Sequence, residues 1–387
     1  MMQMTMLKLL IGAAMVIQSC NCSTINPFWD GGIEFIEIQQ IFEDERFPNV
    51  VVAMDGCVVA TWGNKNMRVR RSHDGGQNWE PEILVASPGF QGGGTTVDET
   101  TGDILFFIEE SHPISPLMVY RSKDHGKNWL SENVIIYPDE KGNTPSMHMN
   151  ERGITLRYGH YPGRLIRPSR FYAGGNNREF WADHYTNAIY SDDHGKTWNT
   201  SAPFPATGTG EAALEELEDG SIYYNSRRHM STDGLNPRKR HIARSFDGGE
   251  TWENLSVCND LPDGAQHTDY GLMAGLVRLP LEGYDILLYS NIDVPAETED
   301  ETVPFEYRTS RRIRGTVWAS FDGGKTWPVK RLVDEGPFAY SSMAAGRNGT
   351  ASEGLIYLFY ESGQGAKIAR FNLDWVTGGR DWKEFLP

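Results

Sequence analysis

The stretch Ser320-Phe321-Asp322-Gly323-Gly324-Lys325-Thr326-Trp327 decides the fold, because its pattern occurs five times in the 387-residue chain. Ser, Asp, Gly and Trp recur at fixed spacing as S-x-D-x-G-x-x-W, and successive copies lie 50 to 75 residues apart. Five chance matches to four fixed residues in one chain are not credible. A motif repeated at such intervals is typical of folds built from one supersecondary unit used many times. The other copies begin at Ser72, Ser122, Ser191 and Ser245.

Each box has the chemistry of a hairpin turn. The Asp side chain accepts bonds from amides further along the turn, Gly adopts a positive φ, and Trp packs back onto the sheet. Alternating strand-like stretches precede the boxes, as at residues 67–71 and 315–319. Each repeat therefore resembles a four-stranded antiparallel blade. About 60 residues per blade gives six blades, so we predict an all-β, six-bladed β-propeller with five box hairpins on its rim, as a single domain over 25–387.

Composition agrees with this class and excludes others. The 44 aromatic residues and 41 glycines favour a turn-rich β protein over a helical one. The net charge of −16 repels phosphate backbones, so we expect no nucleic-acid partner. Only four Cys residues occur, without a C-x-x-C pair, which argues against a disulfide scaffold or a zinc site. No cofactor or metal is implied.

The N-terminus has the pattern of a signal peptide. Lys8 precedes an apolar run over residues 9–17, which is short for a membrane span. We expect residues 1–22 to be removed near Ser19 to Ser23, and the protein to be secreted or otherwise extracytoplasmic, including lysosomal. A weak lipoprotein box would alternatively attach lipid to Cys20. No other run of 18 apolar residues occurs, so no transmembrane segment is expected.

Three arginines lie near predicted strand ends: Arg46, Arg227 and Arg312. A propeller brings such ends together at one face of its central channel. Three converging guanidiniums would bind a carboxylate through paired hydrogen bonds. Any one of them alone is more often part of a surface ion pair.

The boxes, these arginines and the closing segment 370–375 resemble the sialidases (exo-α-neuraminidases), six-bladed propellers with Asp-box hairpins. Arg46 lies in an Arg-x-Pro motif, and Arg227 ends the E-L-x-D-G-x-x-x-x-N-x-R motif that starts at Glu216. Arg312 lies eight residues before the Ser of the last box. By this resemblance, Arg46, Arg227 and Arg312 form the triad that binds the substrate carboxylate.

The same resemblance implies the catalytic pair. Glu211 lies sixteen residues before Arg227, and Tyr340 lies 28 residues after Arg312 in a Tyr-Ser segment. Tyr340 would be the nucleophile and Glu211 its base. A tyrosine avoids the repulsion that a carboxylate nucleophile would meet from the substrate's own carboxylate. Glu361, in Phe-Tyr-Glu, would neutralise and orient Arg46.

One element of the family pattern is missing. The acid/base aspartate is expected between Arg46 and the first box, but residues 61–68 contain neither Asp nor Glu. Asp55 lies in that interval, but its Met-Asp-Gly sequence indicates a turn residue rather than a catalytic acid. Substitutes would come from the glycine run at 91–94, from residues 109–112 or from residues 145–148, with His112 and His148 as candidate acids. Arg170 and Asn176 are further candidate contacts to sugar hydroxyls.

The leading interpretation is an exo-glycosidase acting on terminal α-linked sialic acid or a related 2-keto sugar acid, with sialylated or other acidic glycans as partners. The missing aspartate leaves open a catalytically weak or inactive carbohydrate-binding propeller. A propeller lyase or glycosidase acting on another acidic sugar also stays open. A kelch or WD-type scaffold is disfavoured, because its repeats are shorter and lack the box. The acidic run 296–306 is expected to be a solvated loop.

Overall fold

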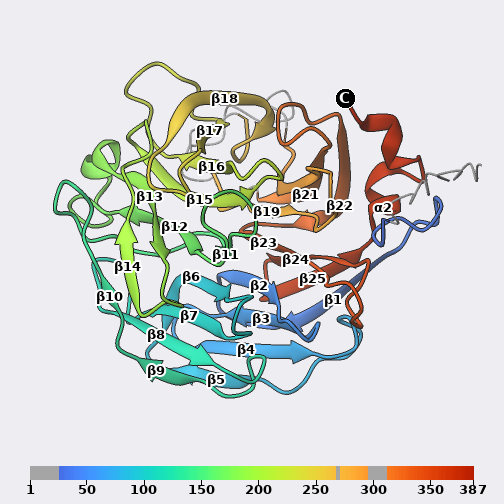
Figure 1. The fold of residues 1–387 in the computed structure, drawn as a ribbon, viewed down its shortest axis with the longest axis horizontal. Helices are drawn as coiled ribbons and strands as arrows, with labels where there is room; N and C mark the ends of the chain where they lie inside the picture. The colour runs from blue at the N-terminus through green and yellow to red at the C-terminus, as the bar shows by residue number, and fades with distance from the viewer. Residues whose placement is uncertain (1–25, 267–270, 295–311) are drawn as a thin grey trace, which may run out of the picture.

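The computed structural model describes residues 26–266, 271–294 and 312–387. The proposed signal peptide, Cys20 and the acidic run at 296–306 lie outside these residues. Six sheets surround a central channel, which confirms the predicted six-bladed propeller (Figure 1). In the described part of the chain, no helix is long and apolar enough to cross a membrane.

Each blade runs outward from an innermost strand, and neighbouring blades contact one another through their inner strands. Blade 1 contains β2 (Pro48–Val52), β3 (Val58–Trp62), β4 (Met67–Ser72) and β5 (Ile83–Ala86). Blade 2 contains β6 (Phe90–Val97), β7 (Ile104–Glu109), β8 (Leu117–Ser122) and β9 (Leu130–Glu132). Blade 3 contains β11 (Ile154–Thr155), β12 (Leu165–Phe171), β13 (Tyr185–Ser191), β14 (Thr197–Thr200) and β10 (Ile135–Ile136).

The second half of the chain completes the ring. Blade 4 contains β15 (Thr209–Glu216), β16 (Ile222–Arg228), β17 (Lys239–Ser245) and β18 (Glu253–Pro262). Blade 5 contains β19 (Gly275–Arg278), β20 (Leu287–Ile292), β21 (Ile313–Ser320) and β22 (Val329–Pro337). Blade 6 contains β23 (Ser341–Ala345), β24 (Ile356–Glu361), β25 (Ala366–Phe371) and β1 (Ile36–Phe42).

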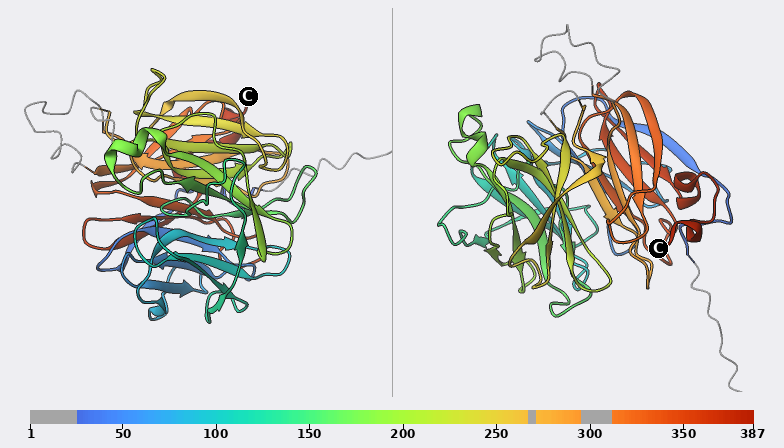
Figure 2. Two further views of the ribbon diagram at one scale, coloured as in Figure 1. Left: turned by 90° about the vertical axis from the view of Figure 1, so that its left-hand side faces the viewer. Right: turned by 90° about the horizontal axis from the view of Figure 1, so that it is seen from above.

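Two blades depart from the simple four-strand repeat. Blade 3 has a fifth strand, because β10 pairs in parallel with β14. Blade 6 takes its outermost strand, β1, from the start of the described chain, and β1 pairs antiparallel with β25 (Figure 1). This blade has no box. Short helices η1 (Arg178–Asp183), α2 (Leu373–Thr377) and η3 (Trp382–Phe385) complete the fold, and η1 projects at one end of the molecule (Figure 2).

Apolar residues from the two faces of each sheet fill the space between blades. The largest cluster joins blades 5 and 6 and includes Phe28, Phe338 and Trp382, all at most 1% exposed. The five boxes lie between the third and fourth strands of blades 1 to 5, away from the channel. The boxes therefore lie at the outer rim of the propeller, and the channel face is left for other side chains.

Candidate active site

Because the strands alternate in direction, the second strand of each blade ends at the face where the innermost strand begins. Glu109, Arg170, Arg227 and Glu361 lie at or next to the ends of β7, β12, β16 and β24. Tyr340 immediately precedes the innermost strand β23, and Arg46 lies two residues before the innermost strand β2. Sequence positions up to 315 residues apart therefore meet at one end of the channel.

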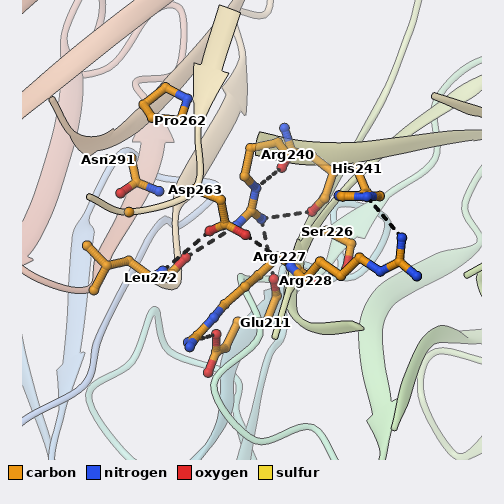
Figure 3. A network of polar contacts seen from close by, with 12 residues as sticks. Glu211, Ser226, Arg227, Arg228, Arg240, His241, Pro262, Asp263, Leu272 and Asn291 are labelled. Atoms are coloured by element: carbon orange, nitrogen blue, oxygen red, sulfur yellow. Dashed lines mark hydrogen bonds and ion pairs between the residues drawn. The ribbon is translucent and has the colours of Figure 1, made fainter. Parts of the chain in front are cut away.

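Tyr340 and Glu211 form a hydrogen-bonded pair. Tyr340 Oη donates to Glu211 Oε1 over 3.4 Å, and Arg227 Nη1 donates to Tyr340 Oη over 3.4 Å. Arg227 also forms an ion pair with the other oxygen of Glu211, as Figure 3 shows. All three side chains are at most 3% exposed. A carboxylate is thus placed to take the phenolic proton, and a guanidinium is placed to stabilise the phenolate.

The other two predicted arginines lie over the tyrosine ring. The guanidinium carbon of Arg46 is 5.3 Å from the ring centroid of Tyr340, and that of Arg312 is 5.1 Å from it. Arg46 is held by Glu361 through two bonds, Nε to Oε1 at 3.0 Å and Nη2 to Oε2 at 3.1 Å. The structure therefore brings together the three arginines, Glu211, Tyr340 and Glu361. The Arg46 side chain keeps 45% of its surface exposed, so an anionic ligand can reach it.

A β-bulge places Glu211 in the channel. The pairing of β15 with β16 shifts between Thr209 and Ala212, which leaves Gly210 and Glu211 out of register. Gly210 is required there, because a Cβ atom would lie 2.3 Å from the His229 ring. Bulges re-aim side chains in this way next to functional sites.

A buried ion pair supports this strand end from behind (Figure 3). Arg240 Nη1 donates to Asp263 Oδ1 over 3.0 Å, and Arg240 Nη2 donates to the Glu211 carbonyl over 3.3 Å. The second oxygen of Asp263 accepts the Arg228 amide at 3.0 Å. Burial raises the pKa of Asp263, while Arg240 and Arg227 oppose that rise. Sequence reasoning missed this pair, because neither residue belongs to a recognisable local motif.

Arg170 lies behind Glu211 and does not line the open part of the site. It is 2% exposed, and its Nη2 donates to His184 Nδ1 at 2.9 Å and to His229 Nδ1 at 3.3 Å. Burial, followed by the nearby Arg170 charge, lowers the pKa of His184 to about 4, so this imidazole is a neutral acceptor. Arg170, which we expected to contact sugar hydroxyls, therefore bonds to two imidazoles of the protein in this structure. Asn176 is exposed in the loop before η1.

The two candidate histidines lie on the blade 2 side of Tyr340. His148 is fully buried, and its Nδ1 donates to the Gln91 carbonyl over 3.0 Å. Burial, and then the neighbouring His112, lower the pKa of His148 well below its ordinary value. His112 is half-buried, and its ring centroid is 4.8 Å from that of His148. His112 therefore borders the site, whereas His148 supports it.

The glycine run of β6 is engaged within the protein. Gly93 and Gly94 take positive φ values, and their carbonyl oxygens accept bonds from Arg167. A Cβ at Gly94 would lie 2.0 Å from the Asn49 side chain. These glycines therefore permit close packing of blades 1 to 3.

The loop that would carry an acid is a tight turn. Glu45 accepts the amides of Asn64, Lys65 and Asn66 at 2.8, 2.9 and 3.2 Å. The Asn66 side-chain amide donates to its other oxygen at 3.0 Å. Asp55 accepts the Cys57 amide at 3.0 Å, which is the turn role expected for it. The carboxylates of Glu45 and Asp55 are therefore committed to turns.

These features define a propeller whose channel face carries a buried tyrosine–glutamate pair beneath three arginines. The family described as BNR repeat-like domain matches residues 144–352, more than half of the chain. The chain therefore belongs to the BNR repeat-like family.

Sialidases are among its relatives, which confirms the predicted resemblance. A sialidase of Micromonospora viridifaciens is 29% identical over 377 residues, with 87% of this chain and 53% of that protein covered. A sialidase of Bacteroides fragilis (strain YCH46) is 27% identical over 353 residues, with 77% and 57% covered. The chain thus spans just over half the length of these two relatives.

Solved structures agree with the fold. The Hadza microbial sialidase Hz136 is 25% identical, with a TM-score of 0.66 and with 86% of this chain and 66% of that chain covered. A leech intramolecular trans-sialidase has a TM-score of 0.64 at 15% identity, with 88% and 69% covered, and shows the likeness of fold alone.

Proposed function

We propose that the protein is a retaining exo-glycosidase that hydrolyses terminal α-linked sialic acid or a related 2-keto sugar acid. One observation carries this proposal: Tyr340 Oη lies 3.4 Å both from Glu211 Oε1 and from Arg227 Nη1, beneath the guanidiniums of Arg46 and Arg312. A protein that only binds sugar has no use for a phenol paired with its own base. The sialidase relatives support the same assignment.

Each residue has a distinct task in this mechanism. Arg46, Arg227 and Arg312 bind the substrate carboxylate and stabilise it as positive charge develops on the ring. Tyr340 attacks the anomeric carbon while Glu211 takes its proton. A covalent glycosyl–tyrosine intermediate forms, and water then hydrolyses it with overall retention. Glu361 fixes Arg46, and Arg240 fixes the backbone of Glu211.

Release of sialic acid by wild type and by Tyr340→Phe tests the proposal, with an aryl α-sialoside as substrate. We expect Tyr340→Phe to lower kcat by at least about 10³-fold, because the nucleophilic oxygen is gone. Tyr137→Phe is the matched control, since Tyr137 is 49% exposed on the surface. Equal activity in wild type and Tyr340→Phe would remove Tyr340 from the mechanism.

The tight turn at residues 63–66 favours a second candidate, a propeller that binds an acidic sugar without cleaving it. Calorimetric titration with sialic acid separates the two. Binding with no turnover of either an aryl sialoside or sialyl-lactose would support the binder and contradict the hydrolase. A lyase would instead release an unsaturated, ultraviolet-absorbing product.

A further inference from the structure

Cleavage of an unactivated glycoside requires a proton donor on the outer side of the site. The turn at residues 63–66 cannot supply it, because Glu45 accepts three amides there. Burial raises the pKa of Glu45, but hydrogen bonds from the Asn66 side chain and from these three amides outweigh burial and lower the pKa below its ordinary value. Glu45 is therefore ionised and occupied.

Three carboxyl groups at this end of the channel have other tasks. Glu361 binds Arg46 through both oxygens, and Glu211 is paired with Arg227 and Tyr340. Glu109 is 1% exposed and accepts the Ser146 hydroxyl at 2.5 Å. None of these three lies at the solvent-facing mouth of the site, where a leaving group departs.

His112 lies at this mouth of the site. It belongs to the loop between β7 and β8, and its ring packs against those of Phe90 and Tyr172, at centroid distances of 5.9 and 5.6 Å. Phe90 in turn contacts Phe47 at 5.3 Å, and Phe47 stacks on Tyr340 at 5.9 Å. A continuous aromatic layer thus connects the ring of the nucleophile to the imidazole.

The tautomer of His112 is set by its neighbour. Its Nδ1 lies 2.9 Å from the Pro113 carbonyl oxygen, which can only accept, so Nδ1 carries a proton. Nε2 is consequently the atom that gains and loses the exchangeable proton. A histidine fixed in this way can serve first as an acid and then as a base.

Several charged groups act on this imidazole. Burial lowers the pKa of His112, the bond to the Pro113 carbonyl raises it, Arg170 lowers it and Glu211 raises it. His148 and Tyr172, which pack against the ring, are neutral. A substrate carboxylate on the arginines adds negative charge nearby and favours the protonated form.

We propose that His112 is the acid/base group of this site, acting through Nε2 on the leaving oxygen of the substrate. This inference rests on the proposed glycosidase function. Tyr340 Oη bonds to the anomeric carbon and gives its proton to Glu211, while the glycosidic bond breaks and the leaving oxygen takes the proton from Nε2. In the second step water attacks the anomeric carbon and gives a proton to Nε2. The bond between the anomeric carbon and Tyr340 Oη breaks as water attacks, and Tyr340 recovers its proton from Glu211.

The test compares His112→Gln with wild type on two substrates, sialyl-lactose and an aryl α-sialoside. We expect kcat/KM on sialyl-lactose to fall by about 10² to 10⁴. The aryl substrate should lose less than about tenfold in this parameter, because its leaving group departs without a proton. His73→Gln is the matched control, since His73 is a half-exposed histidine in the first box, remote from the channel.

Two further measurements separate catalysis from structural support. The wild-type kcat/KM on sialyl-lactose should fall as pH rises through the His112 titration, and this limb should be absent in His112→Gln. Azide should accelerate the variant on the aryl substrate, because this anion attacks without a base. Equal losses on both substrates, or no loss on either, would overturn the assignment. If wild type cleaves neither substrate, the proposed glycosidase function itself fails.

Discussion

Glu109 is a carboxyl group that the fold keeps from water at the end of β7. Burial raises its pKa to about 8, against the opposing effects of the Ser146 hydroxyl, the Met147 amide and the guanidiniums of Arg167 and Arg170. It is therefore protonated in the folded protein at neutral pH, whereas its ordinary pKa is 4.5. Its Oε2 has no hydrogen-bond partner among the described residues, which is consistent with a buried neutral acid.

Glu109→Gln should flatten the dependence of stability on pH. The folded state holds this proton between pH 4.5 and about 8 while the unfolded chain releases it. The contribution to the free energy of unfolding is thus full below pH 4.5 and is lost as pH rises to about 8. Glutamine keeps the shape and cannot ionise. As pH rises over that interval, we therefore expect the free energy of unfolding of the variant to increase by about 2 to 4 kcal/mol relative to that of wild type.

Urea unfolding at pH 5, 6.5 and 8 measures this difference. Glu110→Gln is the matched control, because Glu110 is the exposed neighbour in the same strand-end segment. Parallel stability curves for wild type and Glu109→Gln would show that Glu109 is ionised in the folded protein.

The box turn is the element that repeats along the chain. In the fifth box, Asp322 Oδ1 accepts the amides of Lys325 and Thr326 at 3.0 Å each, and Oδ2 accepts the Thr326 hydroxyl at 2.7 Å. Ser320 Oγ accepts the Gly324 amide at 2.8 Å. The residue after Asp has a positive φ in every box and is Gly in three of them, at 75, 248 and 323. These contacts explain why Ser, Asp and Gly recur at the same positions in all five boxes.

Asp322→Ala should destabilise blade 5, because two amides and two hydroxyls lose their acceptor at once. We expect the free energy of unfolding to fall by about 1 to 3 kcal/mol, with sialoside turnover unchanged well below the melting temperature. Lys325→Ala is the control, since its side chain is exposed in the same turn. A loss of activity at low temperature would instead connect the rim to the channel face.

Five blades could be located from the boxes, because each box is a local turn with its own sequence motif. The sixth blade has no such motif: β1 and β25 meet only when the ring closes, and Ile36 pairs with Phe371. The same contrast holds in the site. The resemblance to sialidases predicted that Tyr340 pairs with Glu211, but the Arg240–Asp263 pair and the imidazoles around Arg170 join separate segments and have no common motif. The burial of Arg170, which is 2% exposed, could therefore not be predicted from its local sequence.

Closure of the ring is a property of the whole molecule. The carboxylate of Asp374 accepts the Asp30 amide at 2.6 Å and the Gly32 amide at 2.5 Å, and Asn372 Oδ1 accepts the Phe35 amide at 3.0 Å. Phe28 and Phe42 are at most 1% exposed. The start of the described chain is thus hydrogen-bonded and packed onto its end, so the last blade is complete only when both are present.

A chain that starts at residue 44 should therefore fail to fold cooperatively. It lacks β1 and exposes the edge of β25, and removing each of the two buried phenylalanines costs about 3 to 5 kcal/mol. That loss is comparable with the whole stability of a typical domain, about 5 to 15 kcal/mol. A chain that starts at Asn26 keeps β1 and is the matched control. Calorimetry should show one sharp transition for the control and a broad or absent one for the shorter chain. Equal melting temperatures would show that the ring holds without its closing strand.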